Sequence, residues 1–240
     1  MNLAEAKLVR DQGLAVAVAD YKVMIARFDK AAKPSPGRPP ATGPATSRAP
    51  HRYGTGSDGM RPIVDDLTPP VDPDRDHWRG GERAAVTLVE YGDYECPYSR
   101  MAFRAIQRLE QQLDGQLRFV FRHFPLTRIH PHALATAHLA EATALQGRFW
   151  PMHELLFGHQ QALEDADLLG YADRLGLDRG RLTIDLDGPT VRQHVQVDAD
   201  SALASGARGT PTLFINGRLH LAGYDQPTLG AALATAIKQR

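Results

Sequence analysis

Residues 85–99 read AVTLVEYGDYECPYS, and this stretch decides the fold class. Its first seven residues form an apolar, β-branched run of strand length, which predicts a buried strand. Glycine and acidic residues at positions 92–95 then turn the chain, and Pro97 suits the first position of a helix. Apolar residues at helical spacing continue as far as Leu113, so the pattern places Cys96 at the N-terminus of a long helix.

A second strand follows this helix. Residues 117–122, LRFVFR, come directly after it and predict a β-α-β unit with parallel strands and a right-handed crossover. Near the C-terminus, Asn216-Gly217 predicts the turn of a hairpin, and residues 226–238 predict a last helix. We therefore expect an α/β domain over residues 84–240.

A helical insertion separates the two halves of this domain. Residues 131–206 contain apolar residues at helical spacing, punctuated by glycines. The predicted helices cover residues 131–146, 149–163, 166–175 and 189–206.

The N-terminal part of the chain has a different composition. Residues 1–30 carry apolar side chains at a spacing that predicts amphipathic helical segments interrupted near Gly13. Residues 31–83 are rich in proline and glycine, so we expect a disordered linker followed by an extended lead-in arm.

Composition restricts the function classes. Lysine plus arginine equals aspartate plus glutamate at 28 each, which gives no reason to expect nucleic acid as a partner. The single cysteine excludes an intramolecular disulfide and argues against a secreted, disulfide-stapled scaffold. The apolar stretch at residues 14–19 is too short for a membrane span and does not follow the order of a signal peptide. We expect a cytoplasmic protein without a membrane span.

Cys96 is the first candidate for chemistry. A thiol reacts as its thiolate, and the free N–H groups and positive dipole end of a helix stabilise that anion. The alternative is that Cys96 is a small buried apolar residue, as lone cysteines commonly are.

The order of strand, cysteine at a helix start, helix, parallel strand and Gly209-Thr210-Pro211-Thr212 before a hairpin resembles that of a thioredoxin-fold oxidoreductase. The inserted helices resemble those of the DsbA-like branch. Within that branch the chain resembles the thioredoxin-like domain that some bacteria carry fused behind the sodium/proton antiporter NhaA. This similarity rests on residues 71–77, 86–98, 119–125, 130–132, 147–150 and 209–217. We do not expect the transport function to carry over.

The resemblance implies roles for particular residues. The family's second cysteine is replaced here by Ser99, which can hydrogen-bond a thiolate but cannot form a disulfide. We expect a monothiol cycle in which Cys96 attacks protein or small-molecule disulfides. Thr210 and Pro211 resemble the family's cis-proline element, which binds extended substrate.

The remaining expectations concern the residues and molecules around Cys96. Pro97 and Tyr98 are expected to tune the thiolate and to shape the rim of the site. No bound cofactor is expected. Glutathione or another low-molecular-weight thiol is the expected co-substrate, because the chain has no second thiol to resolve a mixed disulfide.

Two other functions remain open. Ser99 could mark lost catalysis in a fold that binds polypeptides or persists as a remnant. The kappa-type glutathione transferases also use this fold and activate glutathione with a serine near the same helix start, although Ser99 lies three residues late for that role.

We expect no metal site. The histidines considered lack the paired spacing of ligands in a closed metal site, and Cys96 is the only cysteine that could supply a sulfur ligand. They are His123, His130, His132 and His138.

Overall fold

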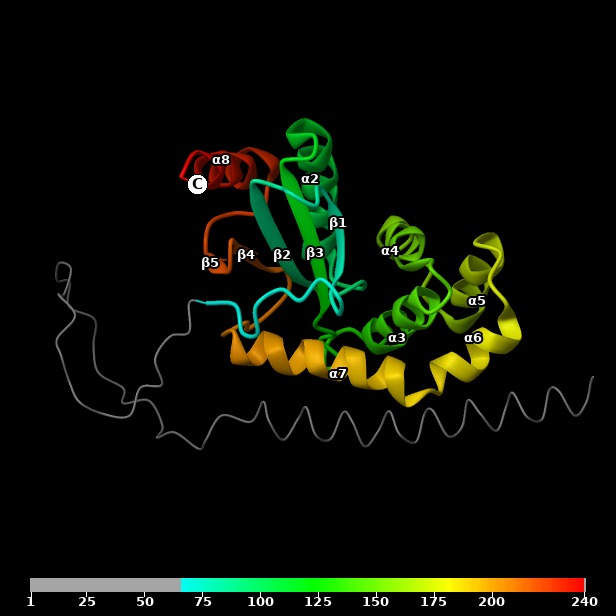
Figure 1. Ribbon diagram of the computed structural model, residues 1–240. Coiled ribbons are helices and arrows are strands. Elements are labelled where there is room, and N and C mark those ends of the chain that lie inside the picture. The colour runs from blue at the N-terminus through cyan, green and yellow to red at the C-terminus, as the bar shows by residue number, and fades with distance from the viewer. Residues whose placement is uncertain (1–65, 240) are drawn as a thin grey trace, which may run out of the picture. The chain divides into compact units, whose positions relative to one another are not determined.

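The computed structural model describes residues 66–239 (Figure 1). The predicted helical segments at 1–30 and most of the predicted linker lie outside the described residues. Five strands form one sheet in the order β1-β3-β2-β4-β5. They are β1 (His77–Gly80), β2 (Val86–Gly92), β3 (Leu117–His123), β4 (Thr212–Ile215) and β5 (Arg218–His220).

The centre of the sheet is the predicted β-α-β unit. Strands β2 and β3 are parallel and α2 (Pro97–Leu113) connects them, while the other three pairings are antiparallel. The central strands are buried on both faces along most of their length, and even their polar residues Glu90 and Arg122 are buried. The predicted mixed α/β thioredoxin fold with a helical insertion is confirmed.

Helices cover the sheet and extend beyond it. In Figure 1, α2 and α8 (Gln226–Lys238) lie together above the sheet, and α7 (Pro189–Ala204) crosses below it. Four inserted helices form a group to one side. They are α3 (Ala133–Ala144), α4 (Phe149–Gly158), α5 (Asp165–Arg174) and α6 (Arg179–Leu186). Helix α3 packs against both α4 and α7.

Helix α6 differs from the prediction, because the sequence predicts a connection between Gly176 and Gly188. The helix has only eight residues and buries a single side chain, Leu182, so its apolar periodicity is weak. Its N-cap is Asp178, whose carboxylate accepts a hydrogen bond from the Arg181 amide.

The lead-in arm differs from the prediction, because part of it belongs to the fold. We placed the domain boundary at residue 84, but β1 already forms an edge of the sheet and pairs with β3. The buried Arg122 guanidinium donates to Asp76 and to the carbonyls of Pro69 and Pro70. Prolines supply no amide hydrogen, but their carbonyls remain acceptors, and Arg122 uses them to fasten the arm.

Within residues 66–239, no helix combines the length and apolar composition that crossing a bilayer requires.

Candidate functional site

Cys96 lies where the sequence predicts it, immediately before α2. It is the N-cap residue, with φ −70° and ψ 121°, and Pro97 occupies the first turn. Proline has no amide hydrogen to donate. This costs nothing at that position, because amides in the first turn of a helix have no acceptor within the helix. The thiol is 3% exposed and lies at the positive end of a 17-residue helix.

The structure brings Cys96 together with the second predicted motif. The Cys96 sulfur donates a hydrogen bond to the Thr210 carbonyl oxygen at 3.3 Å, across 114 positions of sequence. The Thr210–Pro211 peptide bond is cis, as the resemblance implied. Thr210 and Pro211 thus face the thiol from the residues just before β4.

Ser99 has a different partner from the one expected. Its side chain is fully buried, and its oxygen accepts a hydrogen bond from the Asp93 amide at 3.3 Å. In the described part of the chain, no hydrogen bond joins Ser99 to the Cys96 sulfur. The hydroxyl orients the loop before Cys96. A buried hydroxyl held in this way does not face a glutathione ligand, which argues against the kappa-type alternative.

Asp93 organises the loop that carries the cysteine. Its Oδ1 accepts from the Glu95 amide at 2.9 Å, and its backbone oxygen accepts from the Cys96 amide at 3.1 Å. Its Oδ2 accepts from the Leu126 amide at 2.9 Å and contacts His130 Nδ1 at 2.7 Å. The hydrogen bond to Asp93 raises the pKa of His130 above its ordinary value.

Glu95 connects the same loop to the start of α3. Its carboxylate accepts from the His132 amide at 2.6 Å and contacts His132 Nδ1 at 2.9 Å. This hydrogen bond raises the pKa of His132. The two histidines therefore serve the active-site loop as partners of its carboxylates.

Gln160 is a contributor that the sequence analysis did not identify. It follows α4, and its Nε2 donates to the carbonyl oxygens of Tyr94 at 2.6 Å and Cys96 at 2.9 Å. The same Cys96 oxygen accepts from the Arg100 amide in the first turn of α2. Nothing local to Gln160 signals this contact, because it depends on how the insertion packs.

Two exposed large side chains lie on the first turns of the helix that begins after Cys96. Tyr98 and Met101, on the first turns of α2, are each 57% exposed. Burial raises the pKa of Tyr224, and the charges of Tyr98 and Cys96 raise it further. Tyr224 therefore lies near both residues. This combination offers apolar surface to a chain that reaches the thiol.

A buried acid lies in the strand that leads to the loop. Glu90 on β2 is fully buried, and neither of its carboxylate oxygens has a hydrogen-bond partner within residues 66–239. Burial raises the pKa of Glu90 to about 8. Gly92 leaves room for this side chain, because a Cβ there would lie 3.0 Å from Glu90 Oε1 and 2.4 Å from the Phe121 ring.

The four histidines considered for a metal site do not converge. His130 and His132 contact Asp93 and Glu95, as described, whereas His123 contacts Glu141 at 2.8 Å. His138 is partly buried, and the desolvation of its ring lowers the pKa of the imidazole to about 4.

Comparisons with known proteins show which proteins this chain is similar to. A family model described as Thioredoxin matches residues 72–238. Na(+)/H(+) antiporter NhaA 1 of Salinispora arenicola is 47% identical over 179 residues, which cover 75% of this chain and 27% of the antiporter. The chain thus spans less than a third of that relative's length.

Solved structures show the same fold. A thioredoxin-like oxidoreductase from Silicibacter pomeroyi is 28% identical with a TM-score of 0.61, and the match covers 70% of this chain and 92% of that one. DsbA2 of Pseudomonas aeruginosa is 30% identical with a TM-score of 0.55, and the match covers 67% and 93% of the two chains.

Proposed function

Because the chain belongs to the thioredoxin family and has DsbA-like structural relatives, we propose that it is a thiol–disulfide oxidoreductase that works through one thiol, Cys96. The family and those relatives support an oxidoreductase-like function in general. The mechanism through a single thiol is the finer part of the proposal. The observation that carries the proposal is the position of the Cys96 sulfur, at the N-terminus of α2 and against the Thr210 carbonyl.

The cycle has two exchanges. The Cys96 thiolate attacks a substrate disulfide, so that a bond forms between Sγ and one substrate sulfur while the substrate S–S bond breaks. The second substrate sulfur leaves as a thiolate and takes up a proton. A low-molecular-weight thiol, such as glutathione, then attacks as its thiolate, forms a disulfide with the first substrate sulfur and releases Cys96.

The residues around Cys96 have different proposed roles in binding substrate. In the resting state the thiol donates to the Thr210 carbonyl, so loss of the thiol proton leaves this carbonyl oxygen free to accept from a substrate amide. The exposed side chains of Tyr98 and Met101 are available for apolar contact with the substrate. This arrangement suits an extended polypeptide that carries a disulfide.

Ser99 explains why a second molecule takes part in the cycle. A cysteine at this position would attack the mixed disulfide from within the chain, whereas a hydroxyl cannot. The proposed compartment is the cytoplasm, where reduced low-molecular-weight thiols are available.

The experiment that tests this proposal is incubation with oxidised glutathione followed by intact mass measurement. We expect one glutathione on the wild-type chain and none on Cys96→Ser. Reduced glutathione should then remove the adduct and support reduction of a test disulfide. If the wild type forms no adduct and reduces no disulfide, the proposal is rejected.

A second candidate function is polypeptide binding without catalysis. It is favoured by the 3% exposure of Cys96 and by Ser99 in place of a resolving cysteine. The alkylation rate of Cys96 against pH separates the two functions. An activated thiol reaches half its maximal rate at a clearly lower pH than free cysteine, whereas an inert thiol does not.

A further inference from the structure

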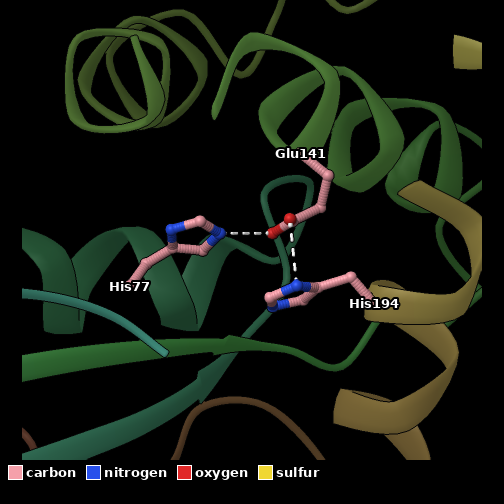
Figure 2. A group of neighbouring side chains, drawn as sticks. All are labelled: His77, Glu141 and His194. Atoms are coloured by element: carbon pink, nitrogen blue, oxygen red, sulfur yellow. Dashed lines mark hydrogen bonds and ion pairs between the residues drawn. The ribbon is translucent and has the colours of Figure 1, made fainter. Parts of the chain in front are cut away.

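A second group of reactive side chains lies outside the Cys96 loop. His77 from β1, Glu141 from α3 and His194 from α7 converge on one another, and Figure 2 shows the carboxylate between the two imidazole rings. His77 Nε2 lies 2.7 Å from Glu141 Oε1, and His194 Nδ1 lies 3.4 Å from Glu141 Oε2. One ligand atom from each residue lies within 4.8 Å of the other two.

These separations suit one metal ion. Tetrahedral ligands at about 2.0–2.1 Å from zinc lie about 3.3 Å from one another. Small side-chain movements therefore convert the present contacts into metal–ligand bonds. Two imidazoles and one carboxylate are ligands that zinc accepts, whereas calcium and magnesium prefer oxygen alone.

A neighbouring histidine holds Glu141 in place, and a carboxylate lies near His194. His123 Nε2 contacts Glu141 Oε1 at 2.8 Å, and Asp198 Oδ2 lies 3.9 Å from the second ring nitrogen of His194. Asp198 is fixed in turn, because it accepts from the His123 amide at 2.8 Å and pairs with Arg75. Carboxylates behind histidines are the usual outer contacts of metal ligands in proteins.

The His77 ring is fixed by stacking. Its centroid lies 3.6 Å from that of Phe149, with an interplanar angle of 14°. The ring is not sealed from solvent, since the His77 side chain is 17% exposed and that of His194 is 18% exposed. A cavity of about 280 Å³ borders His77 and is lined also by Trp78, Phe149 and Trp150.

We propose that His77, Glu141 and His194 bind a divalent transition-metal ion of the zinc class, with one coordination position left to water. The site is separate from the thiol chemistry, since none of its ligands belongs to the loop around Cys96. It differs from the expectation drawn from the sequence, because its three ligands come from three distant elements rather than from a spaced motif.

Metal binding to the full-length, untagged chain tests the proposal. After treatment with a chelator, equilibrium dialysis against Zn²⁺ should give one ion per chain, and the melting temperature should rise with zinc concentration. Co²⁺ should give visible absorption bands of a tetrahedral site without a sulfur-to-cobalt band. No bound zinc in the wild type, or a sulfur-to-cobalt band, would overturn the proposal without recourse to any variant.

Matched variants locate the site. Glu141→Gln and His194→Ala should each abolish zinc retention, provided that circular dichroism shows a folded chain. Cys96→Ser and His159→Ala, the latter at an exposed histidine, should retain it. Zinc retained by folded Glu141→Gln and His194→Ala, or lost from Cys96→Ser, places the ion elsewhere and refutes the assignment.

Discussion

Glu90 provides the most quantitative prediction. Its carboxyl group is fully buried, and its pKa is raised by burial from 4.5 to about 8. In the unfolded chain the group has its ordinary pKa, so between pH 4.5 and 8 the folded protein holds a proton that the unfolded chain has released. Stability must therefore fall as the pH rises through this window. Glu90→Gln removes the titration and nearly preserves the shape.

The magnitude follows from the difference between the two pKa values. Each pH unit corresponds to about 1.4 kcal/mol, so the full loss above pH 8 amounts to about 5 kcal/mol, and the loss at pH 7 to about 3 kcal/mol. Protonated glutamate and glutamine both bury polar atoms without partners here. The two proteins should therefore have similar stability near pH 4.5, and the variant should be the more stable at neutral pH.

Urea unfolding at several pH values measures the effect. Both proteins should carry Cys96→Ser, so that the thiol does not react during the experiment. The difference in unfolding free energy should grow steadily from pH 4.5 to 8 and then level off. Glu82→Gln, at an exposed glutamate, is the matched control and should show no such trend. A constant difference across the pH range would refute the reasoning.

Three further predictions concern the site and its support. Ser99→Cys places a second thiol one helical turn after Cys96, so oxidation should give an internal disulfide instead of a stable glutathione adduct. Intact mass measurement distinguishes the two products, and a persistent adduct would argue against this geometry. Gln160→Ala removes two hydrogen bonds and should lower the unfolding free energy by about 1–3 kcal/mol while speeding Cys96 alkylation, and an unchanged rate would contradict the role given to the glutamine. Arg122→Met leaves the buried Asp76 with fewer partners and should cost about 3–5 kcal/mol in urea unfolding, whereas a near-neutral effect would show that the arm is held by other contacts.

The parts of the fold that depend on local pattern were predictable. Cys96 precedes a helix because a proline and an apolar periodicity follow it within one turn. The hairpin turn falls at Asn216 and Gly217, whose φ values of 49° and 81° are those that asparagine and glycine tolerate best. The pairing of Cys96 with Thr210 could be anticipated only from the family resemblance, because 114 positions separate the two residues.

The rest depends on contacts that no local pattern records. The edge strand β1 has four residues and lies next to a proline-rich arm, so its composition resembles that of a linker. Asp93 looks like an ordinary turn residue until the chain brings His130 beside it. Glu90 stands in an apolar run, where a carboxylate would be expected to face solvent, yet it is buried without a partner. The structural roles of these residues depend on tertiary packing.

Gln160 also links the helical insertion to the backbone of the loop that carries Cys96. It stands just beyond α4, and its amide holds carbonyl oxygens on both sides of the cysteine loop. The Cys96 carbonyl belongs at the same time to the first turn of α2 through the Arg100 amide. A displacement of α4 relative to α2 therefore has to stretch or break these two hydrogen bonds.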